Sequence, residues 1–256
     1  MKVSIITVVY NGASTIKTCI ESVLGQQYHD LEYIIIDGAS TDETVEIVKK
    51  YGSKIAVFCS EPDGGIYDAM NKGIALATGE LIGILNADDF LRDSTVVGKV
   101  VNKLTACQAD ALYADLIYVD GQDSTIVKRY WRSGVAKRSS FLWGWMPPHP
   151  TFFLKRASYE KFGTFRLDLG SAADYELMLR MVYKHGVKTA YLPEITTVMR
   201  VGGVSNSSIL NRLKANKNDR LAWEVNQLKP YLFSIWLKPI RKILQFFNKP
   251  QRPLNN

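Results

Sequence analysis

The first 90 residues alternate between apolar, strand-like runs and amphipathic, helix-like runs, and this alternation limits the folds open to the chain. The strand-like runs are rich in β-branched residues and almost wholly apolar, as expected of parallel strands buried on both faces. Strands that alternate with helices predict a doubly wound α/β sheet whose site lies at the carboxyl ends of the strands. The predicted strands read VSIITVVY, LEYIIID, KIAVFCSEPD and LIGILNADD, and the helices between them STIKTCIESVLGQ, STDETVEIVKKYG and GIYDAMNKGIALATG.

The pattern loosens after Phe90. STVVGKVVNKLTA predicts a helix, DALYADLIYVD one or two strands, and GQDSTIVKRYWRS a polar turn followed by a strand. FLWGWMPPHPTFFLKR is aromatic and rich in proline, and we expect a shaped surface loop there, because prolines break helices and strands. SAADYELMLRMVYKHG predicts a helix that presents Leu177, Met178, Met181 and Val182 on one face.

Composition narrows the class of protein further. With 256 residues, 46% of them hydrophobic, the chain can bury a substantial core. Its three cysteines are widely spaced and odd in number, which argues against a disulfide framework and favours a reducing compartment. The net charge of the chain is +7, and the excess of positive charge lies after residue 206, where the sequence has ten basic and two acidic residues. No apolar run is long enough to predict a membrane-spanning helix.

Each predicted strand of the first half ends in polar or acidic residues. Because the carboxyl ends of parallel strands meet at one edge, these side chains converge. Converging carboxylates repel one another, so a divalent metal beside a diphosphate is the simplest explanation. For Asp88 and Asp89 alone, the capping of a turn is an adequate alternative. The residues are Asn11 after the first strand, Asp37 after the second, Glu61 and Asp63 after the third, and Asn86, Asp88 and Asp89 after the fourth.

Two common nucleotide-binding motifs are absent from the sequence. No GxGxxG follows the first strand, and there is no GxxxxGK[ST] anywhere in the chain. A dinucleotide-dependent dehydrogenase and a P-loop enzyme are therefore both disfavoured.

These residues together resemble the bacterial glycosyltransferase family 2 enzymes of the GT-A fold. The resemblance is carried by SIITVVYNGASTIKTCIESVLGQQYHDLEYIIIDGASTDETVEIV and by SEPDGGIYDAMNKGIALATGELIGILNADD. It implies a GT-A domain over residues 1–205, with a nucleotide-sugar-binding half (1–90) and an acceptor half (91–205). Residues 206–256 then form a basic, amphipathic helical tail.

The resemblance also implies roles for the strand-end residues. Asp37, in IIIDGASTD, matches the family's aspartate that contacts the nucleotide base, and NAD at 86–88 lies where the family has its DxD motif. Asn86 replaces the first acid of that motif, so it is expected near the ribose, while Asp88, helped by Asp89, is expected to hold Mg²⁺ or Mn²⁺. The other residues expected around the donor are Val9, Asn11, Asp63, Asn71 and Lys72.

Two residues of the second half gain roles from the same resemblance. In the family an acidic pair opens a helix, and its aspartate is the general base; here Ala173 replaces the first acid and Asp174 remains. By itself Asp174 is equally explained as a first-turn acid favoured by the helix dipole. His149 matches a histidine of the acceptor or diphosphate region, although a lone histidine is as often structural.

The tail predicts an interfacial helix. Leu232, Trp236, Ile240, Ile243 and Phe247 form an apolar stripe opposite Lys238, Arg241 and Lys242, as in helices that lie on an anionic leaflet. Packing on the protein itself or on a second subunit is the alternative. Nucleic acid is not expected, because the basic residues form no dense patch.

The resemblance implies an inverting, metal-dependent glycosyltransferase of the hexosyltransferase type. It would move a sugar from a nucleoside diphosphate to a lipid-linked glycan during assembly of capsule, exopolysaccharide or O-antigen, a part of lipopolysaccharide. It would be cytoplasmic or peripheral on the inner face of the cytoplasmic membrane. A non-catalytic GT-A module that binds nucleotide sugars is the first alternative, because Asn86 and Ala173 each replace an acid. A nucleotidylyltransferase is the second, but VVYNGASTIK lacks the expected phosphate loop.

Overall fold

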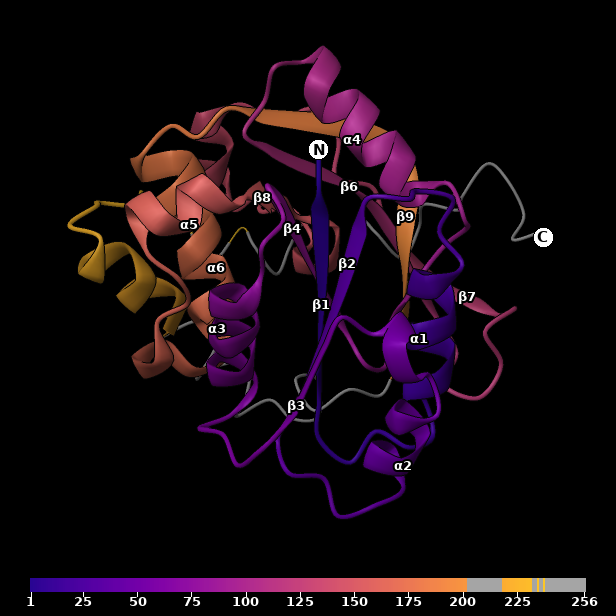
Figure 1. Ribbon diagram of the computed structural model, residues 1–256. Helices are drawn as coiled ribbons and strands as arrows, with labels where there is room; N and C mark the ends of the chain where they lie inside the picture. The colour runs from indigo at the N-terminus through magenta and orange to yellow at the C-terminus, as the bar shows by residue number, and fades with distance from the viewer. Residues whose placement is uncertain (202–217, 232–233, 235–236, 238–256) are drawn as a thin grey trace.

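The computed structural model describes residues 1–201, 218–231, 234 and 237. A nine-stranded sheet with helices on both faces forms the body of the protein (Figure 1). The strands are β1 Val3–Val9, β2 Leu31–Asp37, β3 Val57–Ser60, β4 Leu81–Asn86, β5 Phe90–Leu91, β6 Ala111–Val119, β7 Val127–Trp131, β8 Phe153–Lys155 and β9 Thr189–Arg200. The α-helices are α1 Ile16–Leu24, α2 Thr44–Lys49, α3 Ile66–Leu76, α4 Val96–Ala106, α5 Arg156–Phe162 and α6 Ala173–Met178.

The sheet has a parallel half and a mixed half. Its strand order is β3-β2-β1-β4-β8-β6-β9-β5, with β7 paired to β6. Strands β1 to β4 are parallel, as the sequence predicts. The short strand β8 runs antiparallel between β4 and β6, so β6 points the same way as β4, and β9 is parallel to β6. The α/β fold class predicted from the alternating pattern is thereby confirmed.

Burial of the central strands follows from helices covering both faces. Every residue of β1 is buried, and alternate residues point to opposite faces. Ile6 packs in one hydrophobic cluster with Met70 of α3. Ile5 packs in a second cluster with Ile20 of α1 and Val100 of α4. The nearly continuous apolar runs in the sequence are therefore explained by a sheet with no face open to water.

The aromatic, proline-rich segment from Phe141 to Arg156 is not the surface loop that the sequence predicts. Phe141 and Trp145 are buried and meet edge to face at 5.3 Å, and Trp145 meets Tyr113 of β6 at 5.2 Å. Pro150 lies within a short 3₁₀ turn over His149–Thr151, and Pro148 directly precedes that turn. The expectation was wrong because burying large aromatic side chains outweighs the irregular backbone that prolines require.

The helix predicted from SAADYELMLRMVYKHG is present in two parts, α6 and a π-helical continuation over Leu179–Lys184. The four residues predicted to share its apolar face are all buried. Glu176, on the same helix, is also buried, and it forms an ion pair of 2.8 Å with the Nε of Arg180. The carboxylate of Glu176 is therefore occupied by an ion pair that stabilises the helix.

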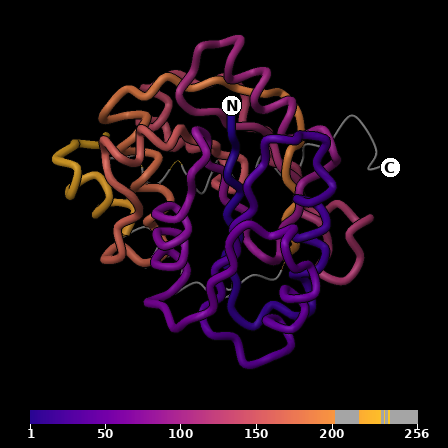
Figure 2. The backbone as a smooth tube through the Cα atoms, in the orientation of Figure 1, coloured from indigo at the N-terminus to yellow at the C-terminus, as the bar shows by residue number. Residues whose placement is uncertain are grey.

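The part of the C-terminal region that the structure describes packs against α6 (Figure 2). Trp223 is fully buried, and its indole nitrogen donates a hydrogen bond of 2.9 Å to the hydroxyl of Tyr175. Asn226 donates to Glu176 at 2.8 Å. The predicted boundary near residue 205 and the apolar stripe of the tail lie outside the described residues. Within the described residues, no helix has the length and apolar character needed to cross a bilayer.

Glu32 of β2 lies at the amino-terminal end of the sheet, and we expect its replacement by glutamine to destabilise the protein by about 3 kcal/mol at pH 7. Burial alone would raise the pKa of Glu32, but hydrogen bonds from Lys2, Ser4 and Thr78 outweigh it and lower the pKa to about 2. A carboxyl whose pKa falls on folding stabilises the native state above its unfolded pKa of 4.5 and loses this effect as the pH falls toward 2.

Urea unfolding at pH 7 and at pH 3 tests this prediction. The difference in unfolding free energy between wild type and Glu32→Gln should shrink at the lower pH. Glu46→Gln, at an exposed position on α2, is the control and should change stability little at either pH. A difference that is the same at both pH values would contradict the assignment.

Candidate functional site

The strand register aligns the polar ends of β1 to β4. Val9 of β1 is paired with Asp37 of β2, and Val8 is paired with Asn86 of β4. Asp37 is paired in turn with Ser60 of β3. The residues expected around a ligand are therefore held side by side at the carboxyl edge of the parallel half, where doubly wound sheets bind ligands.

Asp37 is buried and bound by the loop that follows it. Its carboxylate accepts hydrogen bonds from the backbone and the hydroxyl of Ser40, at 3.0 and 2.5 Å, and from the hydroxyl of Ser60 at 2.7 Å. Gly38 lies directly against Asp63, because a Cβ at Gly38 would come within 2.6 Å of Asp63 Oδ2. The carboxylate of Asp63 thus lies against Gly38, the residue that follows Asp37, and a side chain at Gly38 would displace it.

Asn11 connects the loop after β1 to the loop after β2. Its backbone lies in the left-handed region, with φ of 50°, which asparagine tolerates better than most residues. Its side-chain oxygen accepts a hydrogen bond of 2.8 Å from the backbone of Thr41, and its own backbone nitrogen donates to Ser40 at 2.7 Å. Asn11 therefore orders the rim of the site through the same loop that holds Asp37.

The end of β4 carries an amide and two carboxylates. Asp89 is fully buried, and this burial, followed by the negative charge of Asp88, raises the pKa of Asp89 well above its usual range. Asn86 Nδ2 lies 3.4 Å from Asp89 Oδ2, and Arg200 donates a hydrogen bond of 2.8 Å to the backbone oxygen of Asp88. The buried atoms Asn86 Oδ1 and Asp89 Oδ1 have no hydrogen-bond partner among the residues that the structure describes.

The polar atoms at the end of β4 show whether the residues there fit the metal site that the sequence predicts. Among the residues that the structure describes, no group of three or more His, Cys, Asp or Glu side chains could hold an ion. Mg²⁺, however, commonly takes one or two carboxylates and completes its shell with water and phosphate oxygens. Asp88 together with two unsatisfied acceptor oxygens fits a cation that is shared with a phosphorylated ligand. The residues do not fit a cage made of protein ligands alone.

Asp174 lies in the first turn of α6, and its Oδ1 accepts a hydrogen bond of 2.7 Å from the backbone of Tyr175. Tyr67 of α3 lies beside it: burial raises the pKa of Tyr67, and the charge of Asp174 raises it further. Burial lowers the pKa of His149, and Asp174 opposes that change. The Nε2 of His149 is buried and has no hydrogen-bond partner in the described part of the chain. The ring of Phe165 lies 5.4 Å from Tyr67 and 6.0 Å from His149. The structure therefore gathers His149 and Asp174 around one aromatic group.

Asn71 and Lys72 have structural partners in the described part of the chain. The amide of Asn71 donates to the backbone oxygen of Phe165 and accepts from its nitrogen, both at 2.9 Å. Lys72 forms an ion pair of 2.8 Å with Glu61 and donates to the backbone of Pro62. Asn71 thus fixes the segment that leads to Asp174, and Lys72 fixes the loop after β3. Their contact with a donor stays a prediction.

Sequence reasoning did not identify Tyr118, Arg129 or Arg200 as site residues. Tyr118 of β6 is paired with Arg129 of β7, whose guanidinium lies 4.2 Å from the centre of the tyrosine ring. Burial raises the pKa of Tyr118, Arg129 opposes the rise, and Asp89 and Asp174 add to it. The charges at the β4 end and at the start of α6 therefore both act on Tyr118. The polar turn in GQDSTIVKRYWRS predicts this hairpin, but not its register.

Known proteins resemble the chain along most of its length. The model of the family described as Glycosyl transferase family 2 matches residues 4–167. An uncharacterized glycosyltransferase of Mycobacterium tuberculosis is 34% identical over 181 residues, covering 70% of this chain and 68% of the relative. A PGL/p-HBAD biosynthesis glycosyltransferase of Mycobacterium bovis is 28% identical over 211 residues, covering 80% of both chains. Chondroitin synthase of Pasteurella multocida is 31% identical over 84% of this chain, which spans 22% of that protein.

Solved structures agree on the fold. TarS of S. aureus, residues 1–349 with UDP, superimposes with a TM-score of 0.67 at 21% identity and covers 93% of this chain and 68% of its own. The mannosyltransferase PcManGT of Pyrobaculum calidifontis, with GDP-Man and Mn²⁺, gives 0.66 at 19% identity and covers 99% and 77%. The sheet and its flanking helices are therefore those of the GT-A fold. The chain belongs to glycosyl transferase family 2.

Proposed function

We propose that this glycosyltransferase is an inverting, metal-dependent hexosyltransferase that moves a sugar from a nucleoside diphosphate to a hydroxyl of a lipid-linked glycan. The observation that carries this proposal is the position of Asp174. Asp174 lies beside Tyr67, in the first turn of α3, and α3 follows the carboxyl end of β3, so this carboxylate of α6 lies on the side of the sheet where β4 ends in Asn86. A nucleotide at the strand ends and an acceptor beside α6 would meet between them.

On the donor side, each residue has a chemical reason for its role. Asp37 and Asp63, which flank Gly38, offer carboxylate oxygens to the N–H groups of a base. The unpaired Oδ1 of Asn86 can accept a hydrogen bond from a ribose hydroxyl. Asp88 would hold Mg²⁺ or Mn²⁺, which supplies positive charge to the departing diphosphate. Among the proteins that share the fold, PcManGT was solved in complex with GDP-Man and Mn²⁺, and TarS in complex with UDP and with UDP-GlcNAc.

On the acceptor side, Asp174 would act as the general base. The acceptor oxygen attacks the anomeric carbon, the bond from that carbon to the diphosphate oxygen breaks, and the acceptor proton passes to Asp174. A single displacement of this kind inverts the configuration. A retaining mechanism through a covalent intermediate would need a nucleophile, and Glu176, the next acid on the helix, is buried in its ion pair with Arg180.

The acceptor class rests on the relatives and on the tail. The M. bovis relative is named for PGL/p-HBAD biosynthesis, and the P. multocida relative is a chondroitin synthase. We place the chain in assembly of a bacterial surface glycan such as capsule, exopolysaccharide or O-antigen. It would work on the cytoplasmic face of the membrane, where the basic, apolar tail would meet anionic lipid.

Release of nucleoside diphosphate tests the proposal. Purified protein would be assayed with UDP-, GDP- and dTDP-sugars, with Mn²⁺, Mg²⁺ or EDTA, and with or without a lipid extract. We expect metal-dependent release from one donor, stimulated by lipid. Donor binding without release under every condition would overturn catalysis and favour the non-catalytic module, for which the loss of acids at Asn86 and Ala173 would be the explanation.

Gly38→Ala should raise the dissociation constant of the donor about tenfold, while the protein stays folded. The added Cβ would lie 2.6 Å from Asp63 Oδ2, so the carboxylate of Asp63 must shift from the position it holds beside Gly38. The expected loss corresponds to about one charge-assisted hydrogen bond. Isothermal titration calorimetry with the nucleoside diphosphate gives the constant.

Gly98→Ala is the matched control for this substitution. Gly98 lies within α4, and a Cβ there meets nothing within 4 Å, so binding should be unchanged. Equal affinity of Gly38→Ala and wild type would contradict the placement of the base between Asp37 and Asp63.

A further inference from the structure

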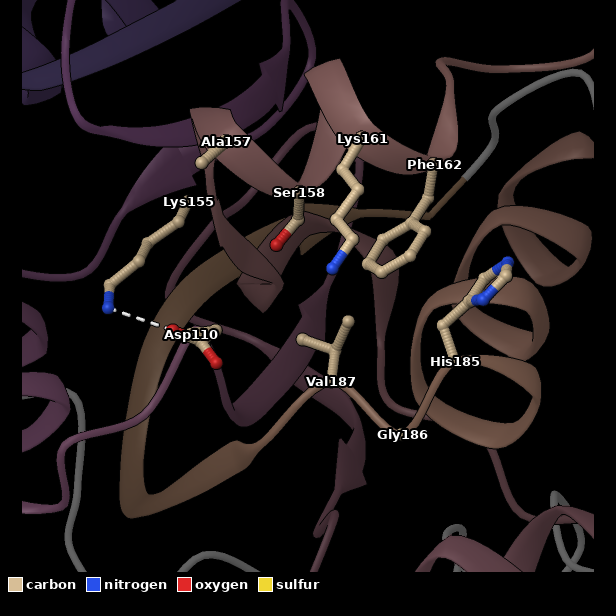
Figure 3. A pocket seen from close by; sticks show the side chains of 9 residues that line it. All are labelled: Asp110, Lys155, Ala157, Ser158, Lys161, Phe162, His185, Gly186 and Val187. Carbon is tan, nitrogen blue, oxygen red and sulfur yellow. Dashed lines mark hydrogen bonds and ion pairs between the residues drawn. The ribbon is translucent and has the colours of Figure 1, made fainter.

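A cavity of about 290 Å³ lies beside α5 (Figure 3). Its other side is formed by the loop that leads from the π-helical continuation of α6 to β9. Asp110, at its edge, directly precedes β6, and Lys155 ends β8, which runs antiparallel to β6. Both residues therefore belong to the amino-terminal edge of the parallel strands. Asp37, Asn86 and Asp88 lie at the opposite, carboxyl edge. The cavity is thus separate from the proposed donor site.

Basic residues outnumber acidic ones in the lining of the cavity. Of its nine residues, Lys155, Lys161 and His185 can carry positive charge and Asp110 alone carries negative charge. Asp110 is already neutralised by Lys155, at 2.8 Å. Figure 3 shows the ammonium of Lys161 and the hydroxyl of Ser158 directed into the space beside Val187. The ammonium of Lys161, which forms no ion pair with an acid of the described residues, and the hydroxyl of Ser158 thus point into one hollow.

The surroundings add to this positive field. His185 stacks on Phe162 with ring centres 4.1 Å apart, and the ammonium of Lys161 lies 5.1 Å from the same ring. Partial burial lowers the pKa of His185, and the nearby positive charges lower it further. Those charges belong to Lys184, Arg180, Lys161 and Arg138. The charge of Arg180 is paired with Glu176. Arg138 donates to the backbone oxygens of Tyr183 and Lys184, and these neutral acceptors do not cancel the positive charge of Arg138.

We propose that this cavity binds a phosphate group, with Lys161 and Ser158 as its hydrogen-bond donors and His185 as a lining residue beyond the ring of Phe162. Phosphate offers several acceptor oxygens and at least one negative charge, which matches an ammonium and a hydroxyl directed into one hollow. The volume leaves room for an ester substituent, so either a small phosphorylated metabolite or the headgroup phosphate of an anionic lipid fits this chemistry. The proposal does not depend on the glycosyltransferase mechanism, because none of these residues belongs to the donor or acceptor side.

Titration of the full chain with inorganic phosphate, followed by NMR of its three histidines, tests this site. The His185 resonance should shift saturably, and the pKa of His185 should rise when an anion offsets the neighbouring cations. His29, in the loop before β2, provides the internal reference and should not follow the same curve. Absence of a saturable shift at His185, combined with vesicle binding that ignores Lys161, would overturn the proposal.

Two substitutions with opposite effects sharpen the test. Lys161→Ala should weaken phosphate binding about tenfold, the effect expected for one charge-assisted hydrogen bond. Asp110→Asn should strengthen it, because the substitution removes the negative charge and releases Lys155. Lys49→Ala, at an exposed position on α2, should leave the affinity unchanged. Equal affinities for all three variants would contradict the assignment.

Vesicle sedimentation distinguishes the two sources of phosphate. Wild type and Lys161→Ala would be compared on phosphatidylglycerol and phosphatidylcholine vesicles. Binding to phosphatidylglycerol that falls in Lys161→Ala would support a lipid headgroup as the natural ligand. Binding that is the same in both proteins, together with a Lys161-dependent response to inorganic phosphate, would support a soluble phosphorylated ligand.

Discussion

Replacing Asp174 by asparagine should slow glycosyl transfer by about a thousandfold and leave donor binding unchanged. General base catalysis typically contributes between about 10² and 10⁴ in rate, and asparagine keeps the shape of the side chain but cannot take a proton. The amide oxygen can still accept the 2.7 Å hydrogen bond from the backbone of Tyr175, so the start of α6 should hold. Steady-state release of nucleoside diphosphate and donor affinity by calorimetry separate the two effects.

Asp168→Asn is the matched control. Asp168 is an exposed acid that precedes the same helix and pairs with Arg166 at 2.7 Å. An exposed pair of this kind contributes little to stability, so turnover should stay near the wild-type value. Turnover of Asp174→Asn close to wild type, with normal donor binding, would remove Asp174 from the role of base. The proposal would then need another proton acceptor near Tyr67 and His149.

Replacing Asp88 by alanine should lower kcat/KM by about 10² to 10³ and remove the metal dependence of donor binding. Asp89 is a poor replacement, because its complete burial, the main cause of its raised pKa, persists when Asp88 is replaced. Asn86 contributes an oxygen but no charge. Asp88 is therefore the principal charged ligand that the β4 end offers to a cation, and the loss matches that of one electrostatic stabiliser of a leaving group.

Calorimetry with nucleoside diphosphate in Mg²⁺, Mn²⁺ and EDTA measures this effect apart from turnover. Wild type should bind more tightly with metal, and Asp88→Ala should bind equally with and without it. Asp30→Ala is the control, since Asp30 is a half-exposed acid that precedes β2 at the opposite end of the sheet. A metal effect that persists undiminished in Asp88→Ala would mean that other groups hold the cation.

The first half of the fold could be predicted from the sequence because its signals are local. Ile5, Ile35 and Ile84 belong to apolar runs that only a sheet covered on both faces can bury, and the runs end where the polar residues begin. The same runs predict that Asp37 and Asn86 come to one edge, because parallel strands point the same way. The β1–β2 and β1–β4 registers agree with that prediction.

The second half could not be predicted in the same way because its stability comes from contacts distant in sequence. Trp145 is buried against Tyr113, and Trp223 against Tyr175, across separations that no periodic pattern encodes. The insertion of β8 between β4 and β6 depends on which edge remains open after β1 to β4 have paired. The prediction of a surface loop was wrong for this reason. Large aromatic side chains near prolines predict burial only when the surface that they pack against is known.

The sequence alone determined the α/β class, the order of the first four strands and helices, and the chemistry available at their ends. The tertiary structure decided which of those groups lie together. The charges of Asp89 and Asp174 both act on Tyr118, and the side chain of Asn71 donates a hydrogen bond to the backbone of Phe165. Lys161, Ser158 and His185 line a cavity at the opposite edge of the sheet. The hydrophobic periodicity of a segment predicts which of its own side chains are buried. Which two segments contact each other depends on the packing of the whole chain.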